Sequence, residues 1–380
     1  MKTRRAFCAL LLMASAALFP TPAAAATADT VVATHLDAPR GVAFLNGRLV
    51  VAEAGHGGPY CDGVPGTPGT TCIGTSSRIS SVNSATGLPE PMVTGLFSAL
   101  EWHGPSPDQL GVDGISARGG KIFGILALAP QLLEGIACPS EPLGADCRAA
   151  KRQAGHLILA SPSGSWRDVA SVGGHDYEYT LQFPSAAQEH DANPYGVLAG
   201  AGGAYVADAG ANTLDFVSNG GRTTVLQHFP FRQNAFPSDE VPDCVARTNG
   251  ALWVGTLAGH LYRIEDGSVT MVEAPALKHV TGCAADESNN LYFVNMFTTP
   301  FPSPFSGNVV KLNADEGTWS VVNTAPLDFP NMVAVGPDGN LYVSADSVCP
   351  ATGGPPFCPF GGTVHRLSVA SGEIQRGEHH

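Results

Sequence analysis

Charged residues are scarce in this chain, and basic ones are the scarcer kind. Only 14% of the 380 residues are charged, and 20 Lys and Arg stand against 33 Asp and Glu. A chain this acidic has little with which to attract nucleic acid or anionic lipid, both of which bind basic surfaces. The low charge also argues against long solvent-exposed helices, whereas 45 Gly and 30 Pro favour short strands joined by tight turns.

Long apolar runs are missing beyond the N-terminus, and so are the familiar catalytic motifs. No later segment is long and apolar enough to cross a bilayer, so we expect no transmembrane anchor. The HExxH and GxSxG motifs, the Walker loop and the EF-hand spacing do not occur. No CxxC pair occurs either, which argues against a metal site built from cysteines. No motif therefore names a reaction.

The first 26 residues have the organisation of a secretory signal peptide. The parts are a basic start, an apolar core and a small-residue cleavage zone: Lys2, Arg4 and Arg5, then Ala9 to Phe19, then Ala23 to Ala26. This predicts a secreted or extracytoplasmic protein whose mature part, residues 27–380, has a net charge of about −16, because three of the 20 bases leave with the signal. The run Thr3 to Phe7 resembles a twin-arginine signal, so Sec and Tat export both stay open.

Eight of the nine cysteines remain after the signal is removed, an even number that suits an oxidising compartment. Six of them form close pairs, which we interpret as three local disulfides: Cys61 with Cys72, Cys138 with Cys147, and Cys349 with Cys358. Cys244 and Cys283 stand at nearly matching places in consecutive repeats. A fourth bridge and two buried free thiols are both open for this pair.

One unit of strand, Gly or Asn turn, and strand recurs six times along the chain. The copies begin at PRGVAF, VDGISA, PYGVLA, PDCVAR, VTGCAA and PNMVAV, and each is followed by a second pair of strands. Six repeats of four strands predict an all-β fold, a six-bladed β-propeller of NHL-like repeats, with residues 27–380 as a single domain. The last repeat lacks a fourth strand after Leu367, so we expect Asp29 to Leu36 to supply it and close the ring.

The predicted loops differ sharply in length between the two faces of the propeller. Turns between first and second strands, and between third and fourth strands, are short. The long segments and all three local disulfide loops fall on the opposite face, which we call the loop-rich face. Long loops on a rigid scaffold commonly carry binding sites. The alternative is that they are stapled decoration that protects an extracellular protein from proteolysis.

Two sets of residues are expected at the channel mouth on the loop-rich face. The first strands begin with Arg40, Asp113, Tyr195, Asp243, Thr281 and Asn331. The second strands of alternate blades end with Glu53, Asp208 and Asn295, whose oxygens suit Ca²⁺ or another divalent cation and make them candidate metal ligands. Asp113, Asp191 and Asp243 join them as candidate ligand-binding residues. The alternative is that these side chains cap strand ends and bond loop backbones.

Three histidines on the loop-rich face are candidate general bases. His103, His190 and His279 lie in or beside connecting segments, and one of them would act as a base if it met a carboxylate such as Asp191. The alternative is that they are ordinary polar surface.

Several stretches resemble the ScyD/ScyE family, exported bacterial propellers named after genes of the scytonemin pigment cluster. They are PRGVAF followed by LVVAEAGHGG, then DANPYGVLAGAGGAYVADAGANTL, then VPDCVARTNGALWVGTLAG. The resemblance runs from about Pro39 to Leu261 and continues more weakly to Leu367. It implies a six-bladed propeller outside the cytoplasm but supplies no established active site. Cys244 and Cys283 depart from the pattern, because Gly or Val is usual there.

These observations lead to two main hypotheses about function. The first is a secreted, monomeric binding scaffold that holds a small molecule or an extracellular protein on the loop-rich face. The second is a metal-dependent lactonase, hydrolase or lyase with a divalent cation at the channel mouth, as in the neighbouring gluconolactonase-like and streptogramin-lyase-like propellers. A structural protein of the cell envelope is a third reading.

Overall fold

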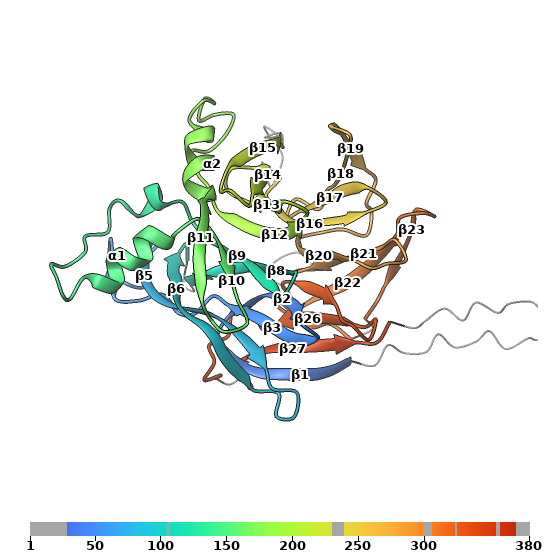
Figure 1. Cartoon of the computed structure of the whole chain (residues 1–380), viewed down its shortest axis with the longest axis horizontal. Helices are drawn as coiled ribbons and strands as arrows, with labels where there is room; N and C mark the ends of the chain where they lie inside the picture. Colours follow the sequence, from blue (N-terminus) through green and yellow to red (C-terminus); the bar gives the residue numbers. More distant parts are fainter. Residues whose placement is uncertain are drawn as a thin grey trace, which may run out of the picture.

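The computed structural model describes residues 29–104, 107–229, 239–298, 306–323, 325–354 and 358–369. The predicted signal peptide lies outside the described residues. Within them, six antiparallel sheets follow one another along the chain and form the blades of a β-propeller (Figure 1). The predicted all-β, six-bladed fold is therefore confirmed.

The first three blades contain the largest additions to the basic four-stranded unit. Blade 1 consists of β2 (Pro39–Leu45), β3 (Arg48–Glu53), β5 (Thr70–Val82) and β6 (Pro89–Trp102), with β4 (Tyr60–Cys61) and β7 (Pro107–Leu110) added. Blade 2 consists of β8 (Val112–Arg118), β9 (Lys121–Leu126), β10 (His156–Ala160) and β11 (Trp166–Ser171). Blade 3 consists of β12 (Pro194–Gly200), β13 (Gly203–Asp208), β14 (Thr213–Ser218) and β15 (Thr223–His228).

The last three blades are simpler. Blade 4 consists of β16 (Pro242–Thr248), β17 (Ala251–Thr256), β18 (Leu261–Glu265) and β19 (Ser268–Val272). Blade 5 consists of β20 (Val280–Ala285), β21 (Asn290–Asn295), β22 (Ser306–Asn313) and β23 (Thr318–Val321), with the short β24 (Leu327–Asp328) beside β22. Blade 6 consists of β25 (Val333–Val335), β26 (Leu341–Ala345), β27 (Gly362–Leu367) and β1 (Asp29–Leu36).

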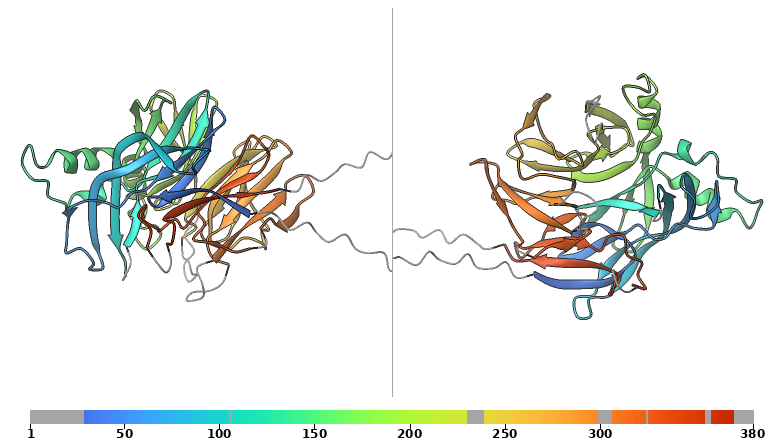
Figure 2. Two further views of the ribbon diagram at one scale, coloured as in Figure 1. Left: turned by 90° about the horizontal axis from the view of Figure 1, so that it is seen from below. Right: turned by 180° about the vertical axis from the view of Figure 1, so that it is seen from behind.

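The ring closes through the strand that precedes the first repeat. β1 pairs antiparallel with β27 and becomes the outer strand of blade 6, as the sequence predicted (Figures 1 and 2). The His365 imidazole also bonds the Asp29 carboxylate, with 2.9 Å between the two atoms. The two ends of the described chain therefore stabilise each other, which limits fraying.

The turns between first and second strands follow from their residues. Asn46 and Gly47 both have positive φ, at 50° and 79°, as do Asn249 and Gly250 at 50° and 78°. A two-residue hairpin turn needs positive φ at both positions, and Asn followed by Gly meets that need best. The Asn-Gly pairs thus turn each chain back so that the second strand lies beside the first.

Neighbouring blades approach most closely where their inner strands leave the loop-rich face. A Cβ atom on Gly196 of β12 would lie 2.4 Å from the carbonyl oxygen of Asp243 in the next blade. A Cβ on Gly114 of β8 would lie 2.4 Å from the carbonyl oxygen of Tyr195. Only glycine allows this approach, which explains why a small residue opens most of the repeats.

All four disulfides are present, which decides the open question about the last pair. Cys61–Cys72, Cys138–Cys147 and Cys349–Cys358 each hold a loop on the loop-rich face. Cys244–Cys283 joins β16 of blade 4 to β20 of blade 5, with their Cα atoms 5.6 Å apart. Four disulfides indicate an oxidising, extracytoplasmic compartment.

Three helical segments lie in connections that the sequence had suggested were irregular. They are η1 (Pro130–Leu133) and α1 (Ala145–Gln153) between β9 and β10, and α2 (Val172–Thr180) between blades 2 and 3 (Figure 1). β5 and β6 also run longer than predicted, because they continue pairing to Thr70 and Trp102 beyond the blade. No helix of the described residues has the length and apolarity of a membrane span.

Replacing Gly196 with Ala should destabilise the protein, because the new methyl group would press on the backbone of the next blade. We expect Gly196→Ala to lower the free energy of unfolding by about 1–3 kcal/mol in urea denaturation. Gly220→Ala is the matched control, since its nearest neighbour, the Ser218 hydroxyl, is 3.8 Å from the added Cβ in an exposed turn. Equal stability of the two variants would contradict the close approach.

Candidate functional site

The residues that open the inner strands gather at the propeller axis and are buried there. Arg40, Asp113, Tyr195, Asp243, Thr281 and Asn331 form this set, the axial polar group, and none is more than 9% exposed. The Tyr195 hydroxyl and the Asn331 amide, from opposite blades, are hydrogen-bonded at 2.7–3.0 Å. The Thr281 hydroxyl donates to the Asn331 carbonyl oxygen at 2.7 Å. Side chains of the axial polar group therefore fill the upper end of the channel.

A shift in strand register lies at most of these positions. The pairing of β12 with β13 skips Tyr195, and the pairing of β16 with β17 skips Asp243. Similar shifts occur at Asp113, at Thr281 and around Arg40. Such a bulge changes the direction of a side chain. The repeated irregularity thus explains how residues of five blades meet at the axis.

Strand β7 covers the axial polar group on the loop-rich face. The Arg40 guanidinium donates to the Gln109 carbonyl oxygen of β7, and the Gln109 amide donates to the Val348 carbonyl oxygen at 3.2 Å. On the other side of the axial polar group, the inner strands line a cavity of about 350 Å³, with Val42, Val197 and others in its wall. The channel mouth expected on the loop-rich face is thus covered, and the cavity lies beyond it.

Two carboxyl groups share one guanidinium in the axial polar group. Arg40 Nε lies 3.8 Å from Asp113 Oδ1, and Arg40 also stabilises the ionised form of Asp243. Burial raises the pKa of Asp113 to about 7, against the opposing effect of Arg40. Burial also raises the pKa of Asp243 well above its usual range, and the nearby Asp113 adds to the rise. Near neutral pH this arrangement can hold or release a proton.

Glu53, at the end of β3, is fully buried and binds its surroundings through both oxygens. The Arg78 guanidinium donates to Oε1 at 2.7 Å and to Oε2 at 2.6 Å. The Ser80 hydroxyl donates to Oε1 at 2.5 Å, and the Asp37 backbone N–H donates to Oε2 at 2.8 Å. A cation at Glu53 would have to displace the Arg78 guanidinium.

Asn295, at the end of β21, holds the connection between blades 4 and 5. Its oxygen accepts the Lys278 backbone N–H at 2.9 Å. Its amide donates to the Ala276 carbonyl oxygen at 3.0 Å and to the Asn308 side-chain oxygen at 2.9 Å. In the described residues, no hydrogen bond or ion pair joins Asn295 or Glu53 to Asp208, so a cation shared by all three stays a prediction.

Asp208, at the end of β13, combines loop bonding with contacts to other carboxyl groups. Its Oδ1 accepts three backbone N–H groups, those of Asn193, Gly210 and Ala211, at 2.7–3.0 Å. Its Oδ2 is buried and has no hydrogen-bond partner among the described residues. The Asp176 side chain of α2 contacts it. Asp208 therefore has one oxygen bound to the loop and one oxygen free.

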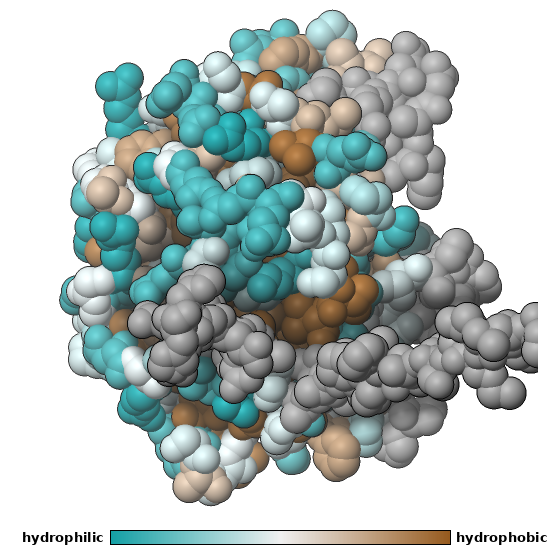
Figure 3. Space-filling view, turned by 90° about the vertical axis from the view of Figure 1, so that its right-hand side faces the viewer, coloured by the Kyte–Doolittle hydropathy of each residue, from teal (hydrophilic) through white to brown (hydrophobic). Residues whose placement is uncertain are grey.

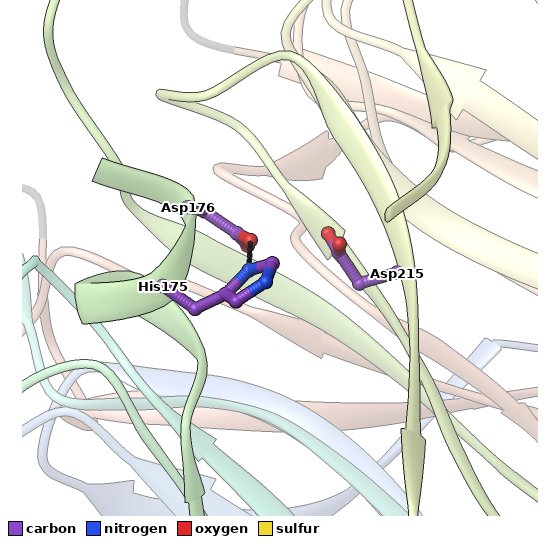
Figure 4. A group of neighbouring side chains, drawn as sticks. All are labelled: His175, Asp176 and Asp215. Atoms are coloured by element: carbon purple, nitrogen blue, oxygen red, sulfur yellow. Dashed lines mark hydrogen bonds and ion pairs between the residues drawn. The ribbon is translucent and has the colours of Figure 1, made fainter. Parts of the chain in front are cut away.

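A group of neighbouring side chains surrounds Asp176, between α2 and blade 3. The ligand atoms of His175, Asp176 and Asp215 all lie within 4.8 Å of one another (Figure 4). His175 Nδ1 lies 2.7 Å from Asp176 Oδ1, and the Thr213 hydroxyl donates to Asp215 Oδ2 at 2.7 Å. We call His175, Asp176, Asp208 and Asp215 the α2 acidic site.

The carboxyl groups of the α2 acidic site hinder one another's ionisation. Burial and the like charge of Asp208 raise the pKa of Asp176 well above its usual range. Burial and the charge of Asp176 do the same to Asp215. Burial raises the pKa of Asp208 to about 7, although the N–H groups on its Oδ1 oppose the rise. Only a proton or a bound cation relieves such repulsion.

Asp191 lies apart from both groups, near the end of β6. Burial raises its pKa, and Glu189 and Asp239 add to the rise. The Glu101 carboxyl is raised in the same way, chiefly by burial, while His103 opposes the rise. His103 lies 3.5 Å from Glu101, so of the three candidate bases it is the one for which the structure places a carboxylate nearby. This pair is at the surface, since the His103 side chain is 70% exposed.

The other two histidines bond backbone oxygens. His190 Nε2 lies 3.0 Å from the Phe183 carbonyl oxygen, and His279 Nδ1 lies 3.3 Å from that of Phe297. Both contacts hold connecting segments in place, which is the ordinary alternative considered for them.

Sequence reasoning missed two members of the α2 acidic site and could have found one. His175 and Asp176 lie in a connection with no motif, and only its folding into α2 brings them to blade 3. Asp215 carried a signal, because it interrupts the apolar run TLDFVS within a predicted strand. It lies on the same side of β14 as Val217, which packs in the apolar core between blades 2 and 3. A carboxylate at such a position needs a partner.

Comparison with known proteins extends the fold but not the function. No protein-family profile and no curated protein matches the chain. A structural-genomics protein of unknown function from Bacteroides thetaiotaomicron is 9% identical, with a TM-score of 0.54 over 90% of this chain and 76% of that one. Virginiamycin B lyase from Staphylococcus aureus is 12% identical, with a TM-score of 0.47 over 90% of this chain and 99% of that one. A luciferin-regenerating enzyme is 10% identical, with a TM-score of 0.49 over 91% and 96%.

These identities show a shared propeller fold and nothing finer. The resemblance to the ScyD/ScyE family stays a prediction.

Raising the pH should destabilise the protein through Asp113. Because burial raises the pKa of Asp113 to about 7, the folded state binds more protons than the unfolded state between about pH 4 and 7. The free energy of unfolding should therefore fall as pH rises through this window. Asp113→Asn should reduce that slope by up to about 1.4 kcal/mol per pH unit.

Urea denaturation at a series of pH values measures the effect. Asp338→Asn is the control, because hydrogen bonds from Asn340 and Arg366 hold the pKa of Asp338 at about 2, so that carboxyl is ionised in both states above pH 5. An unchanged slope in Asp113→Asn would show that this carboxyl titrates normally.

Proposed function

We propose that this chain is an extracytoplasmic binding protein that holds a ligand or protein partner on its loop-rich face. The proposal includes secretion through the N-terminal signal and kinship with the ScyD/ScyE propellers. The observation that carries it is a pair of disulfide-held loops that contact each other and present apolar side chains to solvent.

The two loops come from neighbouring blades. Cys61–Cys72 holds the loop before β5, and Cys138–Cys147 joins the segment after η1 to α1. The Tyr60 hydroxyl of the first loop donates to the Leu143 carbonyl oxygen of the second at 2.9 Å. The segment with α1 projects to the side of the ring beside β5 and β6 (Figure 1).

Exposed apolar residues lie in both loops. Val64 is 72% exposed and Leu143 is 76% exposed. Two disulfides and a hydrogen bond hold their loops before any partner arrives, so binding would cost little conformational entropy. By contrast, the side of the molecule in Figure 3 is largely hydrophilic with separate apolar patches. The loop pair thus combines apolar surface with preorganisation, which suits contact with a partner.

The axial polar group supports a structural role in preference to catalysis at the channel mouth. A metal-dependent lactonase, hydrolase or lyase would need an open site for a cation and a substrate there. Asp113 and Asp243 already face the Arg40 guanidinium, and β7 lies above them. For this reason we place the binding function on the loops.

The double variant Val64→Asp, Leu143→Asp should lose its partner while remaining folded, because charges would replace the apolar contact surface. Immobilised mature protein would be exposed to culture medium and envelope extract of the producing organism. Molecules retained by wild type would be identified and quantified by mass spectrometry, and we expect at least about a tenfold loss in the variant.

Met271→Asp is the matched control, because Met271 is 61% exposed on the outer strand β19. A partner retained equally by the wild type and both variants would contradict the loop-pair proposal. Circular dichroism and melting temperature would establish that the double variant is folded.

A further inference from the structure

The α2 acidic site has more acceptor oxygens than donors. Oδ2 of Asp176, Oδ2 of Asp208 and Oδ1 of Asp215 are each buried without a hydrogen-bond partner among the described residues. The three residues are fully buried, and the Asp176 carboxyl contacts those of the other two. Carboxylate oxygens face one another here with no donor between them.

The separation of these atoms suits a single metal ion. The ligand atoms of His175, Asp176 and Asp215 lie within 4.8 Å of one another, which is about the diameter of a coordination sphere with bonds of 2.0–2.5 Å. Figure 4 shows the His175 ring and Asp176 on α2 with Asp215 across from them on its strand. The His175 side chain is 40% exposed, so an ion can reach the group from solvent.

We propose that His175, Asp176 and Asp215 bind one divalent transition-metal ion, with Asp208 bordering the site. An imidazole together with carboxylates favours Zn²⁺ or Mn²⁺ over Ca²⁺, which prefers oxygen ligands alone. The cation would neutralise the mutual repulsion of the buried carboxylates. It would also tie α2, which connects blades 2 and 3, to the second and third strands of blade 3.

The site differs from the cation expected at Glu53, Asp208 and Asn295. Glu53 already has Arg78 as its counter-charge, and the Asn295 oxygen accepts a backbone N–H. The α2 acidic site has no arginine or lysine among its described ion pairs; its one basic neighbour there is the His175 ring. A site with an excess of buried negative charge is the one that gains most from a metal ion.

Calorimetric titration of the mature, chelator-treated protein with ZnCl₂ and with MnCl₂ tests the proposal. We expect one ion per chain and a rise of several degrees in melting temperature at saturation. Asp215→Asn should abolish both effects, and His175→Ala should weaken binding by at least about tenfold. Affinity should fall as the pH falls, because protons compete for the same oxygens.

His56→Ala is the matched control. His56 Nδ1 also lies 2.7 Å from a carboxylate, that of Asp37, but in the described residues this pair is not part of a group of metal-ligating side chains. The control should bind metal as the wild type does.

Two results would overturn the proposal. One is the absence of saturable binding or of any melting shift with either metal at about 1 mM, a concentration that would stabilise even a weak site. The other is unchanged binding in both Asp215→Asn and His175→Ala. Since the metal-free Asp215→Asn protein loses a buried like charge, it should melt no lower than the metal-free wild type, which keeps a folding defect distinct from a loss of ligation.

Discussion

The close approach of the inner strands around the axis is the constraint on which the rest of the structure depends. At Gly114 and Gly196 the next blade's backbone occupies the space of a Cβ atom, so the ring reaches this radius only with glycine there. Between blades 4 and 5 the Cys244–Cys283 bond joins the inner strands covalently. The same contraction brings the axial polar group together and leaves space for a cavity only on the far side.

Carboxyl groups buried by this packing have three different fates. Glu53 has the Arg78 guanidinium as its partner and is a strong structural link between strands of blade 1. Asp113 and Asp243 share Arg40, so their burial is only partly offset and the pKa values of both rise. In the α2 acidic site no guanidinium or ammonium group is paired among the described residues, and oxygen faces oxygen. The number of counter-charges, more than depth of burial, thus separates structural carboxylates from candidate binding groups.

Sequence periodicity predicted the elements that a propeller repeats and missed those that occur once. The Asn-Gly turns, the inner glycines and the closing strand Asp29–Leu36 could all be inferred, because each is a local pattern or the missing member of a counted set. The helices α1 and α2 could not, since each lies in one connection without a repeat to align and has only nine residues. The residues that open the inner strands were expected at the axis, but their burial under β7 was not, because β7 is an addition to blade 1 alone.

The sequence by itself determined the all-β class, the six blades, the ring closure and three of the disulfides, because these follow from local turn chemistry, strand periodicity and short cysteine spacing. Tertiary structure alone decided the Cys244–Cys283 bridge, the cover over the channel and the meeting of Asp176 with Asp208 and Asp215. These depend on how blades and connections pack against one another, and the distance between such groups in space is independent of their spacing along the chain. Asp215 shows the boundary between the two: the strand pattern marked it as an anomaly, but only the position of α2 showed which groups it faces.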